Sequence, residues 1–255
     1  MGKPRYPGMG LHQILSFSRL FLRIPKAEAV FWPGCALQNL EPRILKKTLL
    51  VLSRAEPGIQ MAAACCGQPT RYLFPERMES RERQLQKMLK DRGIKRIYTA
   101  CPNCTLQLQG QPEIKVIPVW DTLAKHLRPE DLEPGAQDCI WHDPCPTRKD
   151  ALQQRAVREI LKLRGITPQE PVQTGCHTHC CGNFHMLHIT DPASSRTMRQ
   201  RRLGQFPESG VIASSCEGCL SAFRGEGRDT AHLLELLFGR SKTRGWGNRL
   251  KNTWK

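Results

Sequence analysis

Ten of the twelve cysteines in this 255-residue chain fall into two blocks with the same internal order. Each block holds a lone cysteine, an adjacent Cys-Cys-Gly and a C-x-x-C sequence, and 34 residues separate the cysteine pair from the C-x-x-C in both blocks. A repeated spacing of this length indicates a duplicated unit. The blocks consist of Cys35, Cys65, Cys66, Cys101 and Cys104, and of Cys145, Cys180, Cys181, Cys216 and Cys219.

Five thiols per unit point to metal chemistry of a particular kind. Thiolates are soft ligands that select zinc, copper(I) or iron-sulfur clusters. A structural zinc needs four ligands, commonly from two C-x-x-C knuckles. Adjacent thiols point in different directions and suit a polynuclear cluster, and Gly67 and Gly182, which follow the pairs, remove a side chain where the backbone is expected to pass close to it. The pattern favours an iron-sulfur cluster in each unit, with zinc in one half or unligated thiols as the alternatives.

The segments before the cysteines are typical of strands. β-prone runs lead into the lone cysteines at 29–32 and 139–142, and into the C-x-x-C sequences at 94–100 and 211–215. Apolar residues at helical spacing predict helices between them, at 42–54, 76–92, 149–163 and 193–206. Strands that alternate with helices predict a parallel sheet, whose ligands lie beyond the carboxyl ends of the strands. We therefore expect an α/β fold of two sequence-repeated, Rossmann-like halves, with parallel strands that end at the cysteines.

The repeat is imperfect after each C-x-x-C. Helix candidates follow at 121–127 and 230–238, but the strand expected at 115–119 has no clear counterpart in the second half. A helix that begins just after each C-x-x-C would direct its N-terminal amides at the thiolates and lower their pKa. The expected organisation is a first half-domain at 27–137 and a second at 138–239.

Basic segments flank the two halves. The chain has a formal net charge of +16, and residues 1–26 and 240–255 carry five and six Lys/Arg with no acid. Such ends dock on acidic proteins or anionic surfaces more often than they bind nucleic acid, so no nucleic-acid partner is expected. The C-terminal segment, with Trp246 and Trp254, is expected to be an unstructured tail.

An amphipathic helix is predicted at 11–24. Its apolar side is expected to consist of Leu11, Ile14, Leu15, Phe21 and Leu22. Packing on this protein or on a partner subunit is favoured over peripheral membrane association. No signal peptide and no transmembrane segment are predicted, so the expected location is cytoplasmic.

The two cysteine blocks resemble those of the cysteine-rich CCG-domain family, found in the cysteine-rich subunit of heterodisulfide reductase and in iron-sulfur subunits of lactate, glycolate and glycerol-3-phosphate oxidation. The resemblance spans about residues 30–225, and the sequences around Cys35, Cys65-Cys66 and Cys145 also match the family pattern. It implies that each set of five cysteines binds a noncubane [4Fe-4S] cluster, two in all. Two departures, Pro146 in place of a common histidine and Asn183-Phe184-His185 in place of a glycine-rich stretch, both lie at the second site.

The function implied is that of a redox subunit. In this hypothesis two clusters face one cleft and split the two-electron reduction of a disulfide, or of another small-molecule substrate, into one-electron steps. The candidate proton donors are His177, His179, His185 and His188. Since ferredoxin-type C-x2-C-x2-C-x3-C-P spacing is absent from the sequence, the electrons are expected from an iron-sulfur or flavoprotein partner subunit.

Two other functions remain open. One is a pure electron-transfer subunit of a flavoprotein 2-hydroxy acid or glycerol-3-phosphate dehydrogenase, and the other is a zinc-stabilised interaction module. In each case, Cys139 is expected as a small core residue and Cys176 as a free thiol, with a spare ligand or redox-active thiol as the alternative for Cys176. His142, next to Asp143-Pro144, is expected in a turn that supports a ligand.

Overall fold

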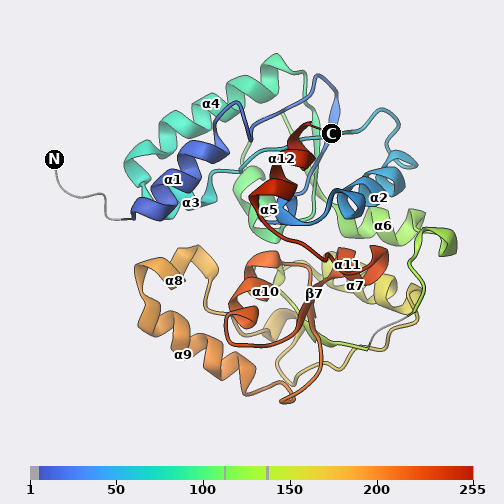
Figure 1. Cartoon of the computed structure of the whole chain (residues 1–255). Coiled ribbons are helices and arrows are strands. Elements are labelled where there is room, and N and C mark those ends of the chain that lie inside the picture. Colours follow the sequence, from blue (N-terminus) through green and yellow to red (C-terminus); the bar gives the residue numbers. More distant parts are fainter. Residues whose placement is uncertain (1–5, 112, 136–137, 255) are drawn as a thin grey trace.

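Two separate parallel sheets organise the chain (Figure 1). This computed structural model describes residues 6–111, 113–135 and 138–254. The first sheet has the strand order β2-β1-β3-β4 and the second has the order β5-β6-β7, with every pairing parallel. The strands are β1 (Ala29–Trp32), β2 (Gln60–Met61), β3 (Arg96–Thr99), β4 (Lys115–Pro118), β5 (Ile140–His142), β6 (Ile212–Ser214) and β7 (Thr230–His232). The α/β fold with two repeated halves, expected from the sequence, is confirmed.

Helices connect the strands and flank both sheets. None of them, in the part of the chain that the structure describes, is long and apolar enough to cross a membrane. The α-helices are α1 (Pro7–Ser16), α2 (Pro42–Ser53), α3 (Gln68–Leu73), α4 (Met78–Asp91), α5 (Pro102–Leu108), α6 (Val119–His126), α7 (Ala151–Leu163), α8 (Leu187–Thr190), α9 (Pro192–Leu203), α10 (Glu217–Arg224), α11 (Leu233–Phe238) and α12 (Trp246–Trp254).

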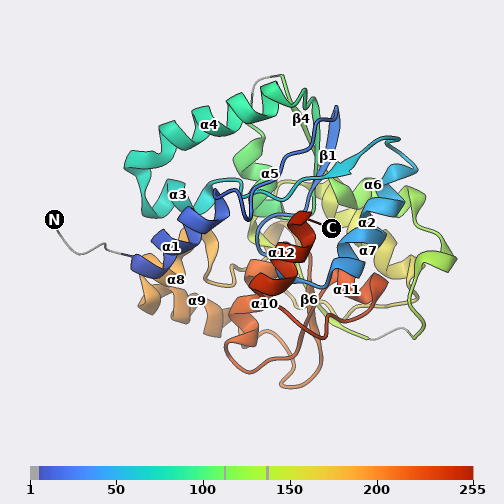
Figure 2. The ribbon, with the colours of Figure 1, turned by 45° about the horizontal axis from the view of Figure 1, so that its top comes forward.

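Four helices, α2, α6, α7 and α11, form a layer between the two sheets (Figures 1 and 2). Alternate strand residues face this layer, as Phe31 of β1 and Trp141 of β5 do, and both are fully buried. Their neighbours Val30 and Ile140 face outward, toward α4 and α5 in the first half and toward α9 and α10 in the second. Burying one such large side chain contributes about 1.5–3 kcal/mol, so the central layer fixes the two halves against each other.

The second half does contain a counterpart of β4. The prediction that the strand at 115–119 has none, and that a helix fills 230–238, is wrong: β7 pairs with β6 as β4 pairs with β3, and α11 starts only at Leu233. His232 ends the strand and caps the helix, since its Nδ1 accepts from the Leu234 amide at 3.2 Å. A three-residue strand buried on both faces has no alternation of polar and apolar residues, and its signal merged with that of the helix.

The first helix differs from its prediction in bounds and in orientation. It runs from Pro7 to Ser16, not over 11–24, and Leu11 and Ile14 are 58% and 60% exposed while Gln13 and Ser16 are buried. Polar partners inside the protein explain the reversal. Gln13 Oε1 accepts from the Thr70 hydroxyl at 2.6 Å, and Ser16 Oγ accepts from Arg249 at 3.0 Å.

The C-terminal segment is ordered, so the expectation of an unstructured tail is wrong for α12. This helix lies between α1 and α2 (Figures 1 and 2). The Asn252 amide donates to the carbonyls of Gln38 and Leu40 at 2.8 and 2.9 Å, and Arg249 is 1% exposed. Because Gln38 lies in the turn that follows Cys35, the C-terminal helix holds one of the cysteine loops in position.

Candidate metal centre

The first five cysteines converge at the carboxyl edge of the first sheet. Cys35 follows the end of β1, Cys65 and Cys66 follow β2, and Cys101 caps α5, whose first turn holds Cys104. Hydrogen bonds from the Cys104 and Cys65 thiols lower the pKa of Cys66 to about 6. The hydrogen bond between Cys35 and Cys65, together with burial, raises the pKa of Cys35. Together with the hydrogen bond between Cys101 and Cys104, these contacts join the five cysteines into one connected group.

The second five converge in the same way at the second sheet. The Sγ atoms of Cys145 and Cys180 lie 3.7 Å apart, those of Cys181 and Cys219 lie 3.2 Å apart, and Cys216 caps α10. Hydrogen bonds from Cys145 and Cys181 hold the pKa of the Cys180 thiol far below its usual range. These contacts favour the thiolate form of Cys180, which is the form that binds metal.

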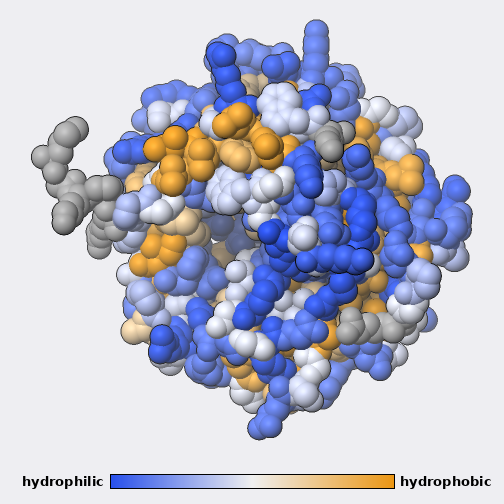
Figure 3. Space-filling view, in the orientation of Figure 1, coloured by the Kyte–Doolittle hydropathy of each residue, from blue (hydrophilic) through white to orange (hydrophobic). Residues whose placement is uncertain are grey.

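Both groups face one cavity of about 530 Å³. The Asn103 amide, inside the first C-x-x-C, donates to Cys216 Sγ of the second at 3.8 Å and joins the two groups directly. In Figure 3 the surface is hollowed between the two halves, next to α1. The cysteines that line the cavity are Cys35, Cys66, Cys101 and Cys104 of the first group and Cys145, Cys181, Cys216 and Cys219 of the second.

Glycines lie beside the thiols in both groups. The amides of Gly67 and Gly182 donate to Cys65 Sγ at 3.5 Å and to Cys180 Sγ at 3.3 Å, so the backbone passes close to a thiol at both predicted glycines. Gly34, which was not predicted, is also close to a thiol, since its Cβ would lie 3.0 Å from Cys104 Sγ. Its φ of +85° also favours glycine.

Gly34→Ala is expected to disturb the first cysteine group and to remove about half of the metal that the protein binds, because the new methyl group displaces Cys104. The measurement is metal content per chain after anaerobic purification. Gly58→Ala is the matched control, since Gly58 has nearly the same φ, +83°, and open space around its Cβ. Equal metal loss in both variants would show that backbone strain alone is responsible.

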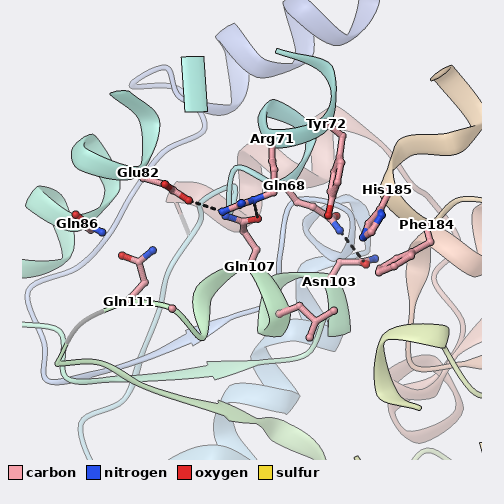
Figure 4. Close-up of a pocket in the computed structure, with 12 residues that line it drawn as sticks. Gln68, Arg71, Tyr72, Glu82, Gln86, Asn103, Gln107, Gln111, Phe184 and His185 are labelled. Atoms are coloured by element: carbon pink, nitrogen blue, oxygen red, sulfur yellow. Dashed lines mark hydrogen bonds and ion pairs between the residues drawn. The ribbon is translucent and has the colours of Figure 1, made fainter. Parts of the chain in front are cut away.

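A segment of the second half reaches across to the first (Figure 4). His185 stacks on Tyr72 of α3 at 4.3 Å and on Phe184 at 3.7 Å between ring centroids. His185 has a left-handed φ of 56°, which costs energy for a residue other than glycine, and its ring contacts two aromatic neighbours in this conformation. Phe184 separates the cysteine cavity from an adjoining pocket of about 410 Å³, and Gln68 and Asn103 also line both. The sequence Asn183-Phe184-His185, which departs from the family pattern, therefore builds a wall of the site.

The predicted histidines lie mostly outside the cavity. His177 is exposed, His179 bonds Gln205 at 3.0 Å, and His185 lines the adjoining pocket. Of the candidates, only His188 lines the cysteine cavity. His12, which was not predicted, also lines it and hydrogen-bonds the Cys35 thiol. No motif could have found His12, because a single histidine in the N-terminal helix has no fixed spacing to the cysteines.

The two cysteines outside the repeat lie away from the site. Cys139 is buried in the central core, as expected, and burial raises its pKa to about 12. Cys176 is exposed.

The site has the properties that an iron-sulfur group requires. Each half supplies five convergent thiols from the ends of strands and the first turns of helices, and a glycine cradle accommodates one group. Buried N–H groups near the sulfur atoms have no partner among the described residues. The donor set and its surroundings therefore fit such a group in both halves.

Together, fold and site define a duplicated α/β protein with a group of five cysteines at the carboxyl edge of each sheet. The chain belongs to the cysteine-rich domain family (CCG), whose model matches residues 29–109 and 139–224. This match covers more than half of the chain and includes all ten cysteines of the repeat.

Similar proteins add little beyond the family. A probable membrane-anchored ferredoxin from Chromohalobacter salexigens is 28% identical over 97 residues, which is 37% of this chain and 14% of that protein. An aspartate racemase from Picrophilus torridus aligns over 88% of this chain and 99% of its own with 13% identity and a TM-score of 0.36. A glutamate racemase from Bacillus anthracis aligns over 82% and 77% with 15% identity and a TM-score of 0.34. Scores this low carry no argument about either racemase fold or racemase activity.

Proposed function

We propose that the chain is an iron-sulfur redox subunit that holds two four-iron, noncubane clusters, one in each half. The ligands proposed are Cys35, Cys65, Cys66, Cys101 and Cys104 in the first half, and Cys145, Cys180, Cys181, Cys216 and Cys219 in the second. Membership of the cysteine-rich family and the similarity to a protein named as a ferredoxin support an iron-sulfur, electron-transfer role.

The observation that carries the proposal is the single cavity lined by both cysteine groups. A chain that only passed electrons onward would need no opening shared by its two centres. The cavity of about 530 Å³ is lined by cysteines of both groups, so a small molecule that entered it would meet both centres. This geometry supports reduction of a disulfide, which takes two electrons and two protons and yields two thiols.

Bound clusters would supply one electron each and an iron atom able to bind sulfur. The chain's own residues have other tasks. The Asn103 amide bonds the second group and holds the two centres together, and Phe184 shields the cavity from the adjoining pocket. His12 and His188, the histidines that line the cavity in the described part of the chain, are the proposed proton donors in place of His177, His179 and His185.

Elemental analysis tests the presence of clusters. Anaerobically purified and reconstituted protein is expected to contain about eight iron and a matching amount of acid-labile sulfide per chain, and to give paramagnetic resonance signals that change on reduction. Stoichiometric zinc without sulfide would overturn the proposal and favour the interaction module.

Titration with 2-hydroxyethyl disulfide tests the substrate step. Reduced protein is expected to be reoxidised, with two thiols formed for each disulfide consumed. A pure electron-transfer subunit would be reoxidised by a one-electron acceptor such as ferricenium and left unchanged by the disulfide. That result would support the presence of the clusters and contradict the proposed catalytic role.

A further inference from the structure

The two halves place an N–H group at the same position of the repeat. Trp32 lies three residues before Cys35, and His142 lies three residues before Cys145, each at the end of its strand. Both side chains are fully buried. Among the described residues, neither Nε1 of Trp32 nor Nε2 of His142 has a hydrogen-bond partner. Leaving a buried polar group unpaired costs about 1–3 kcal/mol. Two unpaired groups at equivalent positions therefore indicate that each binds the same kind of acceptor in the functional protein.

Both side chains are buried in the same region of their half as two cysteines that correspond in the repeat. One ring nitrogen of His142 and the Sγ atoms of Cys181 and Cys219 lie within 4.8 Å of one another. Trp32 packs in the buried cluster that contains Cys66 and Cys104, the first-half equivalents of these cysteines. Cysteine sulfur is therefore close to the His142 ring in the second half and shares the buried cluster of Trp32 in the first.

The hydrogen bonds of Arg202 decide what His142 can do. Arg202 Nε donates to His142 Nδ1 at 3.1 Å, and a guanidinium has no acceptor to offer. Nδ1 must therefore carry a lone pair, which places the proton of the neutral ring on Nε2. With Nδ1 bonded to Arg202 and Nε2 protonated, neither ring nitrogen has a free lone pair, so His142 does not complete a three-residue metal site with Cys181 and Cys219.

Arg202 is itself held rigidly. It is fully buried, it donates to the Gln173 carbonyl and to Gln205 Oε1, both at 2.7 Å, and its guanidinium lies over the Phe206 ring. It acts on the site through His142, by fixing the tautomer and the direction of the ring.

We propose that His142, oriented by Arg202, donates an N–H···S hydrogen bond at the second site, and that Trp32 does the same at the first. This inference rests on the proposed clusters and adds residues that tune them. An N–H donor stabilises negative charge on sulfur, and a reduced cluster carries more of it than an oxidised one. Each residue therefore raises the reduction potential of the cluster in its own half.

The test is an anaerobic redox titration of reconstituted protein, monitored by paramagnetic resonance. Cys104→Ser and Cys219→Ser first assign the signals to the two halves. Trp32→Phe keeps the ring and removes the N–H, and His142→Leu removes the imidazole. At a fixed potential, each is expected to change the oxidised-to-reduced ratio of its own cluster about tenfold toward the oxidised form, which is 59 mV for a one-electron couple. The cluster of the other half is expected to stay unchanged and serves as the internal control.

Conservative variants separate hydrogen bonding from packing. Glutamine can bring an amide N–H to the place of Nε2, whereas the shorter asparagine side chain cannot. His142→Gln is expected to keep the wild-type reduction potential of the second cluster, and His142→Asn is expected to lower that potential. This comparison tests the inference even if His142→Leu fails to fold. Loaded protein whose potentials are equal in all these variants would overturn this inference alone. Protein that contains no iron would overturn the proposed function and this inference with it.

Discussion

Protein in which Cys104 is replaced by serine is expected to retain about half of its iron and sulfide, and the same is expected for Cys219→Ser. The two residues are equivalent in the repeat. Each is buried and forms a hydrogen bond with another cysteine of its group. Serine offers a hard oxygen of high pKa that iron-sulfur clusters do not favour. The double variant is expected to lose nearly all iron. Iron and acid-labile sulfide per chain are the measurements.

Cys176→Ser is the matched control, because Cys176 is exposed and lies outside the repeat. Its iron content is expected to equal that of the wild type. The assignment of one cluster to each half would be contradicted if either single variant lost all its iron, or if the control lost as much as the site variants.

Asp143→Asn is expected to destabilise the protein by about 3 kcal/mol, the cost of breaking a buried ion pair. Asp143 is 3% exposed and forms a bidentate pair with Arg158 at 2.6 and 2.7 Å. It also accepts from the Trp141 indole and from the side chain of Thr174 and the backbone amide of Gly175. These bonds tie the loop before Cys145 to the segment that leads to Cys180. Urea unfolding of anaerobic protein measures the loss.

The pH dependence follows from the same contacts. Burial acts to raise the pKa of Asp143, but the hydrogen bonds from Arg158 prevail and hold that pKa well below its usual range. The unfolded value is about 3.9, so the contribution to stability is complete above about pH 5 and is lost as the pH falls toward the folded pKa. Asp143→Asn is therefore expected to flatten the acid side of the stability profile.

Glu170→Gln provides the control within the same network. Glu170 also pairs with Arg158, at 2.9 Å, but its side chain is 29% exposed. The expected loss is about 1 kcal/mol or less, as for solvated ion pairs. An equal loss of stability in both variants would mean that the network acts by neutralising the charge of Arg158 and not by holding the buried loop before Cys145.

Local sequence could predict the elements that deliver the cysteines. The runs before Cys35 and Cys101 are β-prone, and the corresponding strands β1 and β3 end two or three residues before them. It could not predict β7, whose three buried residues carry no periodic signal. Nor could it orient α1, because the buried Gln13 accepts a hydrogen bond from Thr70, 57 residues away.

The sequence by itself determined the thiol content of the candidate site. The number of thiols, their grouping by fives and their place at the ends of parallel strands all follow from local patterns and spacing. Only the tertiary structure decided that both groups share one cavity and which other side chains meet there. The relation of the halves depends on the packing of α2, α6, α7 and α11 between the sheets. His12 and Arg202 reach the site through contacts between segments far apart in the chain, which no spacing in the sequence encodes.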